Sequence, residues 1–213
     1  MPESVPRAYR SELRARQAQE TRARIIAAAA DLFASQGYQA TTIAAIAREA
    51  GVSAETVKTT ASKAELLIAA FEVTFSGSEA AETLTDTEVA AGVLDLSDKV
   101  FLDAVLSQIT TANARGHALW TVLLGAALSD PVVDAALRAI LDRRRADYRL
   151  LVSELGRRGL AAELDDADAA ADALSFLLSP ESYQQLVAQS GWTADRYASW
   201  LRTAVAAELR SRG

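Results

Sequence analysis

A Gly-Val-Ser junction between two short helical patterns, at Gly51–Ser53, constrains the fold of this chain more than any other feature. Ahead of the junction, apolar residues recur at the spacing of one helix face, and Thr41 or Thr42 precedes them as a capping residue. Gly51 suits the left-handed position that ends a helix, and Ser53 suits the cap of the next one. The connection is so short that the two helices must cross steeply, with Val52 buried between them. The sequence therefore predicts a helix-turn-helix.

The second helix of this pair, predicted over 54–60, has the polar surface of a helix that reads DNA. Only Val57 is expected to face the core. In the major groove lysine pairs with guanine and glutamate accepts from cytosine, whereas threonine and serine reach phosphates. Lys63 begins the following helix, where the N-terminal N–H groups favour a phosphate. The predicted DNA-binding residues are Thr42, Ser53, Ala54, Glu55, Lys58, Thr59, Thr60 and Lys63. A buried helix pair with an ordinary solvated face is the open alternative.

Two further helices complete this predicted DNA-binding domain, which spans residues 21–75. The first is predicted over 21–35 and precedes the helix-turn-helix. The fourth begins at Ser62, which forms a capping box with Glu65, and links the domain to the rest of the chain. Between the first two helices, Tyr38 either packs on the small core or also brings its hydroxyl near a phosphate.

The run from Arg22 to Glu72 resembles the DNA-binding domain of the TetR family of bacterial transcriptional regulators, and a weaker likeness lies between Leu174 and Trp200. The resemblance implies an all-α homodimer that binds palindromic DNA and a small molecule. The residues that carry it are Ile25, Ile26, Leu32, Phe33, Gly37, Tyr38, Thr41, Thr42, Ile46, Ala47, Ala50, Gly51, Val52, Ser53, Thr56, Ser62, Lys63, Leu66 and Leu67, followed by Ser179, Pro180, Glu181, Tyr183, Gly191, Trp192 and Trp200.

The stretch Lys58–Ala61 departs from the family pattern. Family members usually have an aromatic residue at the position of Lys58, another three residues on, and one more residue before the Ser-Lys pair. The aromatic phosphate contact of the family is therefore not carried over to this chain. Either Lys58 replaces it electrostatically, or the helix ends early and sits differently. The departure leaves one alternative function open, a helical small-molecule-binding or scaffolding protein with a degraded DNA-reading helix.

The formal net charge of −6 is unusual for a DNA-binding protein, but the charge is unevenly distributed. Residues 1–75 carry 9 basic and 8 acidic side chains, whereas residues 76–213 carry 13 and 20. Residues 1–20 are rich in arginine and lack an apolar stripe, which predicts a flexible basic arm. Such an arm either reaches along DNA or is a solvated tail. It is not a secretion signal, because no apolar segment follows the arginines.

The second part of the chain is predicted to be a larger helical domain, residues 96–213, after a linker at 76–95. Half of all residues are hydrophobic, and glycine and proline are scarce, as in all-α proteins. Gly116 is expected to interrupt the first long helix of this domain. The absence of cysteine excludes disulfides and thiolate metal sites and fits a reducing cytoplasm. No apolar run is long enough to span a membrane, and no cofactor or metal is expected.

Two sites are predicted in this second domain. One helix pair meeting that of a second copy would form a four-helix bundle, and the resemblance implies that the helices around 169–178 and 194–209 are this interface. A monomer with these helices folded inward is the open alternative. An apolar pocket with polar groups at its edge would bind the effector, or the same side chains are plain core. The predicted pocket residues are Phe101, Val105, His117, Trp120, Leu124 and Tyr148.

These patterns together predict a sequence-specific DNA-binding transcriptional regulator, a homodimeric repressor released by an apolar or amphipathic small molecule. The palindromic DNA site follows from two-fold symmetry of the dimer. An enzyme is not expected, because the chain has no Gly-rich phosphate loop, Gly-x-Ser-x-Gly or His-Glu-x-x-His motif. A cluster of aspartates at 165–168 is best explained by helix capping.

Overall fold

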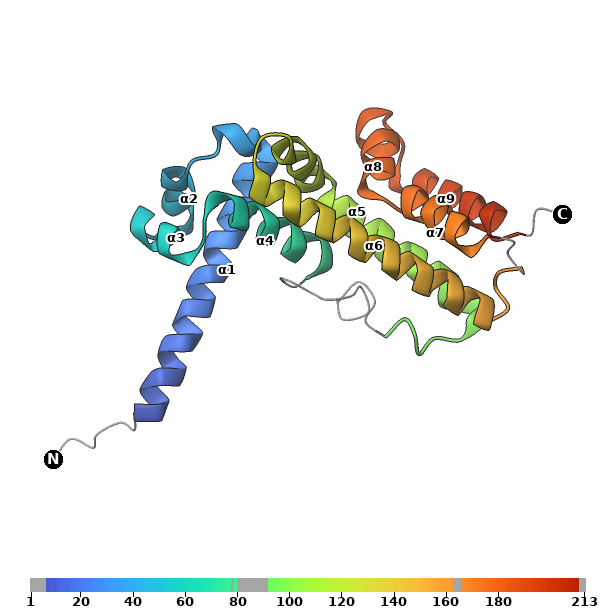
Figure 1. Cartoon of the computed structure of the whole chain (residues 1–213), viewed down its shortest axis with the longest axis horizontal. Coiled ribbons are helices and arrows are strands. Elements are labelled where there is room, and N and C mark those ends of the chain that lie inside the picture. Colours follow the sequence, from blue (N-terminus) through green and yellow to red (C-terminus); the bar gives the residue numbers. More distant parts are fainter. Residues whose placement is uncertain (1–6, 78, 80–91, 163–165, 211–213) are drawn as a thin grey trace.

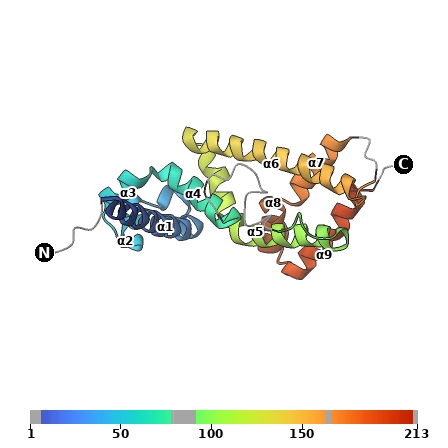
Figure 2. The same cartoon turned by 90° about the horizontal axis from the view of Figure 1, so that it is seen from below.

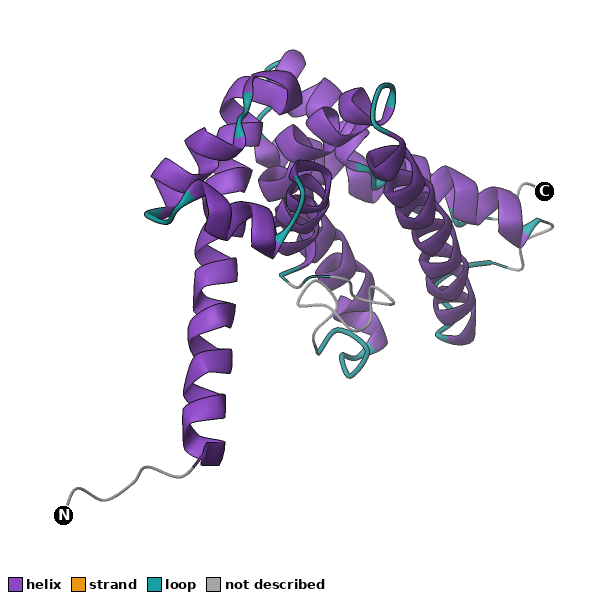
Figure 3. Cartoon of the chain, turned by 60° about the vertical axis from the view of Figure 1, so that its left-hand side comes forward, coloured by secondary structure: helices purple, strands orange, loops and turns teal. Residues whose placement is uncertain are grey.

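The computed structural model describes residues 7–77, 79, 92–162 and 166–210, and most of these residues are helical (Figure 1). Short loops join the helices, and the described part of the chain contains no strand (Figure 3). This confirms the predicted all-α fold. The elements in order are α1 (Arg7–Ala40), α2 (Ile43–Ala50), α3 (Ala54–Thr60), α4 (Lys63–Ser76), α5 (Asp98–Ala127), α6 (Pro131–Arg157), α7 (Ala167–Leu177), α8 (Pro180–Tyr183), the π-helix η2 (Gln184–Gln189) and α9 (Ala194–Glu208).

The helix-turn-helix has the capping geometry that the sequence predicts. The Thr42 hydroxyl accepts a hydrogen bond from the backbone N–H of Ala45 at 3.1 Å and caps α2. Gly51 ends α2 with a φ of 67°, a conformation that costs glycine little. Ser53 caps α3 by accepting from the N–H of Thr56 at 3.0 Å. Local hydrogen bonds therefore define both ends of the turn.

The first helix begins at Arg7, so the predicted start at Thr21 is wrong, and the segment expected to be a flexible arm is helical from Arg7 onward. No glycine or proline lies between Arg7 and Thr21, and extending an existing helix is far easier than nucleating one. The extension projects away from the other helices in Figure 1, and side chains 14–20 are all exposed. Gly37, with a φ of 77°, interrupts the helical geometry where the sequence places the helix end.

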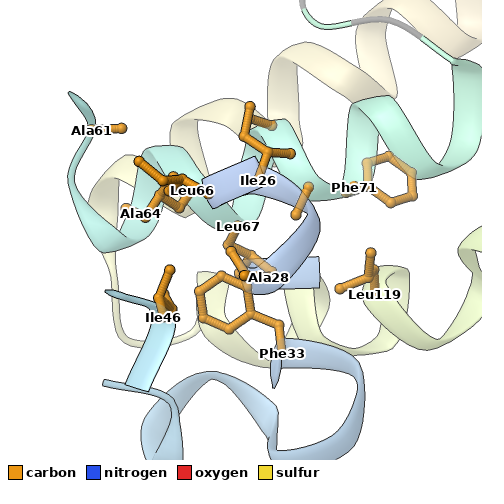
Figure 4. Close-up of a cluster of buried hydrophobic side chains, with 14 of the residues drawn as sticks. Ile26, Ala28, Phe33, Ile46, Ala61, Ala64, Leu66, Leu67, Phe71 and Leu119 are labelled. Carbon is orange, nitrogen blue, oxygen red and sulfur yellow. The ribbon is translucent and has the colours of Figure 1, made fainter. Parts of the chain in front are cut away.

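A first hydrophobic core holds α1, α2, α3 and α4 together. Figure 4 shows Phe33 and Ile46 gathered with Leu66 and Leu67 between these helices. The same core continues into the second half of the chain through Leu119, Trp120, Leu123, Ala126, Val133 and Leu137 on α5 and α6. The predicted boundary at 75–96 therefore does not separate two independent cores, because the end of α5 packs against the helix-turn-helix head.

Gly116 does not break a helix, contrary to the prediction. It is buried in the middle of α5, which runs without interruption from Asp98 to Ala127. A Cβ atom at this position would lie 3.0 Å from the Phe75 ring atom Cδ2 and 3.3 Å from Phe75 Cβ. Glycine therefore allows the end of α4 to approach the α5 backbone closely, and a larger residue here would press on the Phe75 side chain.

A second core joins α5 and α6 to α7, α8 and α9 at the end of the molecule opposite α1–α3 (Figure 2). Asp130, Asp166 and Thr193 cap α6, α7 and α9 through side-chain oxygens, which agrees with the capping role predicted for the aspartates at 165–168. Most of the predicted 76–95 linker, with the short helix expected near 87–93, lies outside the described residues. Among the helices that are described, none is both long and apolar enough to cross a membrane.

Candidate nucleic-acid interface

Helix α3 exposes one polar face and buries the other. Ala54, Glu55, Lys58 and Thr59 are exposed, whereas Val57 is fully buried against α1, α2 and α4. A seven-residue helix at the left edge of the molecule in Figure 1 thus presents four of the predicted DNA-binding residues together. Thr42 and Ser53 are also exposed, but each hydroxyl is already the cap of a helix. These four side chains therefore share one exposed face, and contact of that face with a major groove stays a prediction.

The last two residues of α3, Thr59 and Thr60, are threonines. They lie in the stretch where family members have one more residue before the Ser-Lys pair. Thr60 Oγ1 donates to the Thr56 carbonyl at 2.7 Å, and Thr59 Oγ1 donates to the Glu55 carbonyl at 3.0 Å. Each hydroxyl thus makes a second hydrogen bond to a carbonyl within the same helix, and it folds back onto the backbone instead of pointing outward. Thr60 is half-buried and lies off the exposed face, so of the predicted residues it is the one least able to touch DNA.

Arg22 joins α1 to the end of the reading helix, although it was not among the predicted site residues. Its Nη1 donates to the Thr60 carbonyl at 3.3 Å, and its Nη2 pairs with Glu79 Oε2 at 2.6 Å. The hydrogen bonds to Glu79 raise the pKa of the Arg22 guanidinium. These partners lie 38 and 57 residues away, so no local sequence pattern could have identified the contact.

Lys63 and Tyr38 form a cluster with Asp130 beside the reading helix. The Lys63 ammonium lies 4.4 Å from the centre of the Tyr38 ring, and the Tyr38 hydroxyl donates to Asp130 Oδ2 at 2.6 Å. Burial and this hydrogen bond raise the pKa of Tyr38, and the same bond lowers the pKa of Asp130. Burial lowers the pKa of Lys63, which the charge of Asp130 partly offsets.

The Tyr38–Asp130 contact ties the DNA-binding head to the start of α6. Asp130 also caps α6 by accepting from the N–H groups of Val132 and Val133 through Oδ1, and Gln39 Nε2 donates to the Ser129 hydroxyl at 3.4 Å alongside. The Tyr38 hydroxyl is thus engaged by a carboxylate in this structure, and not directed at a phosphate. A turn next to α2 and a turn next to α6 are thereby linked across 92 residues of sequence.

We expect Asp130→Asn to lower the free energy of unfolding by roughly 1 kcal/mol. Asparagine is as good a cap for α6 as aspartate, so the loss comes from the charged acceptor for the Tyr38 hydroxyl. Urea unfolding measures the change, and Tyr38→Phe should match it. Asp134→Asn is the control, because its exposed ion pair with Arg138 on the same helix contributes little. Equal stabilities of the two asparagine variants would contradict this account.

The six predicted pocket residues do not surround one cavity. Trp120 and Leu124 belong to the first core, whereas Phe101, Val105 and Tyr148 belong to the second. Along α5, Phe101 and Trp120 are about 28 Å apart at 1.5 Å per residue, too far for one small molecule to contact both. The prediction of a single pocket is wrong because helical periodicity shows which residues share a face, but not how far apart they lie along it.

The second core contains a buried polar cluster that the sequence pattern did not indicate. Asn113, fully buried on α5, donates through Nδ2 to the Leu178 and Ser179 carbonyls at 3.0 and 3.1 Å. The Ser182 and Tyr197 hydroxyls share a hydrogen bond of 2.7 Å. Burial raises the pKa of Tyr197, and also that of Tyr148 nearby. Nearby, His117 is hydrogen-bonded to Gln184 of the π-helix, which is a helix type often found at functional sites.

Helices α7 and α9, predicted to contact a second copy, pack side by side and bury one face each in the chain's own second core. Their exposed residues mix small side chains, such as Ala169 and Ala207, with charged ones, such as Asp172 and Arg202. Among the described residues of these two helices, Phe176 is the large apolar side chain left most exposed, at 65%.

Comparison with protein-family models matches residues 25–70 to the family described as bacterial regulatory proteins, tetR family. This stretch contains α2, α3 and the core-forming parts of α1 and α4. It confirms the family resemblance and the DNA-binding role that the helix-turn-helix predicts. No curated protein sequence matches the chain.

Solved structures share the fold over most of the chain. NalD, the secondary repressor of the MexAB-OprM multidrug efflux pump in Pseudomonas aeruginosa, has a TM-score of 0.64 and 16% identity, with 91% of this chain and 98% of that chain covered. A protein of Saccharomonospora viridis, classed as a transcriptional regulator and solved in complex with choline, has a TM-score of 0.66 and 21% identity, with 87% and 95% covered. At these identities the likeness is one of fold.

Proposed function

We propose, on the premise that residues 25–70 are the DNA-binding domain of a tetR-family transcriptional regulator, that this chain is a homodimeric repressor released from its operator by a small molecule. The observation that carries the proposal is the complete α3 helix. Its four exposed positions, Ala54, Glu55, Lys58 and Thr59, form one reading face although the segment departs from the family pattern. The same helix argues against the alternative of a protein with a degraded reading helix.

Dimerisation through α7 and α9 supports recognition of a palindrome. A second copy packed on the outer face around Phe176 would make a four-helix bundle, the closed two-fold arrangement of many homodimers. Two α3 helices related by that axis would enter major grooves one helical turn apart or a multiple of it. Repression follows if such a dimer occupies a promoter.

Release by an effector requires a connection from the second core to α3, and α5 supplies one. In the middle of α5, Asn113 holds the α7–α8 turn, and one and two turns further along Gly116 and Trp120 pack against Phe75 and Phe71 of α4. Helix α6 adds a second connection, because Arg143 pairs with Glu72 of α4 at 3.1 Å. A molecule bound in the second core would shift α4 and change the spacing of the two reading helices.

The effector is a small amphipathic molecule that binds in the second core. Its polar cluster can hydrogen-bond a ligand, and the aromatic rings of Tyr148, Tyr183 and Tyr197 around it can also stabilise a cation. A protein of the same fold binds choline, which makes small organic cations a first class to test. A ligand moves the equilibrium only by its differential affinity for the two states, about 1.4 kcal/mol for each tenfold.

In vitro selection of the purified chain on random duplex DNA tests the proposal. We expect a palindrome to emerge, with the logarithm of affinity falling steeply as salt is raised. Lys58→Ala should relax the sequence preference at one base pair and cost about 1–3 kcal/mol on the selected site, because Lys58 faces the groove. Lys63→Ala should weaken binding to all sequences alike, because a phosphate contact carries no sequence information.

Unfolding curves of both lysine variants serve as the control, since Lys63 also packs over the Tyr38 ring and its removal can cost a little stability. Weak binding without a selected pattern would reject the repressor and favour a helical small-molecule-binding protein.

A further inference from the structure

The first 18 residues of α1, Arg7–Arg24, precede the core residues of this helix and form the basic extension of the molecule. They contain six arginines and two glutamates, a formal net charge of +4 in a chain whose total is −6. Between Arg14 and Arg24 no side chain is buried, and Ile25 is the first buried residue among the side chains of α1 that the structure describes. The stretch from Arg14 to Arg24 therefore contributes nothing to the core, and its arginines are available to a partner of negative charge.

The root of the basic extension lies at the end of the reading helix. The hydrogen bond from Arg22 to the Thr60 carbonyl, 3.3 Å long, places α1 against the last residue of α3. From there to Arg7 the helix extends about 22 Å at 1.5 Å per residue. Both views of the fold show the extension leaving the molecule on the side of α1–α4, away from α7–α9 (Figures 1 and 2).

These dimensions match DNA next to the base pairs that α3 reads. About 22 Å corresponds to two-thirds of a helical turn of 34–36 Å, or some six base pairs. Duplex DNA carries one negative charge for every ~1.7 Å of its axis, so a rod with a charge of +4 meets a dense row of phosphates there. The positive charge and the length of the basic extension therefore both fit duplex DNA as its partner.

We propose that the basic extension binds the phosphate backbone flanking each half-site that α3 reads. The inference rests on the proposed function, because α3 must first enter the groove. Arginine contacts to phosphates strengthen binding and set its salt dependence without reading bases. The extension thus lengthens the DNA footprint of each subunit beyond the base pairs that determine specificity.

The test compares two operator duplexes, one ending at the selected palindrome and one with six further base pairs on each side. The unaltered chain should bind the flanked duplex more tightly and with a steeper salt dependence. The variant R7Q/R10Q/R14Q/R16Q should lose this gain, with a slope of log affinity against log salt lower by about 0.9 for each contact removed. Its base preference should stay unchanged, and glutamine preserves helix propensity.

The charge-matched control is R138Q/R157Q/R202Q/R210Q. It changes two exposed arginines on α6, one within α9 and one just after the end of α9. It should keep the full gain from flanking DNA. A gain in the extension variant equal to that of the control would overturn the inference and leave the repressor model intact. Failure of the unaltered chain to bind any duplex would overturn both together.

Discussion

Replacing Trp120 with alanine is expected to lower the free energy of unfolding by about 3–5 kcal/mol. Trp120 is 2% exposed and packs its ring 5.2 Å from that of Phe71, at the point where α4, α5 and α6 meet. Domains of this size have a total stability of about 5–15 kcal/mol, so the loss would be a large part of it. Urea unfolding followed by circular dichroism measures the change.

Two companion variants separate burial from hydrogen bonding. The Trp120 indole N–H is buried without a hydrogen-bond partner among the described residues, so Trp120→Phe keeps most of the apolar contact and removes an unsatisfied donor. Its cost should be less than half that of alanine. Trp192→Ala, at a half-exposed ring next to Arg196, should cost about 1 kcal/mol or less. A loss for Trp120→Ala no larger than for Trp192→Ala would show that the first core does not depend on this ring.

If the chain dimerises through α7 and α9 as we propose, Phe176→Glu is expected to yield a monomer and to weaken operator binding by roughly 100-fold or more. A glutamate at this position would bring an unpaired charge into an apolar helix contact, which is costly. Two linked reading helices bind a palindrome about 10²–10⁴ times more tightly than one, so loss of the dimer removes that gain. Sedimentation velocity gives the oligomeric state, and titration of a labelled operator gives the affinity.

Leu128→Glu is the matched control for this substitution. Leu128 is 90% exposed on the turn between α5 and α6, outside the α7–α9 face, and it receives the same change in charge. The control should remain dimeric and bind the operator normally. If both variants stay dimeric, the α7–α9 face is not the interface, and if both become monomeric, the effect of Phe176→Glu is not specific to that face.

Local structure could be predicted well because its causes lie within a few residues. The caps at Thr42, Ser53 and Asp130 and the left-handed Gly51 each depend on hydrogen bonds or dihedral angles spanning two to four positions. The exposed face of α3 followed from one buried residue, Val57, and the period of a helix. These features also carry the resemblance to the regulator family.

The sequence-based predictions failed where the same local sequence is compatible with two different structures. Gly116 looks like a helix end by its residue type, yet the missing side chain serves packing against Phe75. The segment before Thr21 looks like a coil because it lacks an apolar face, yet the core of α1 nucleates a helix that continues back to Arg7. The packing of Gly116 is decided by Phe75 on another helix, and the helix before Thr21 is decided by the buried residues further along α1.

The sequence by itself determined the helix boundaries at caps, the helix-turn-helix and the polar reading face, because short-range hydrogen bonds and periodicity act within single elements. Only the tertiary structure decided that Tyr38 meets Asp130, that Arg22 meets Thr60, and that Trp120 lies in a different core from Phe101. These relations depend on how whole helices pack, since burying their apolar faces brings together residues that no sequence interval relates.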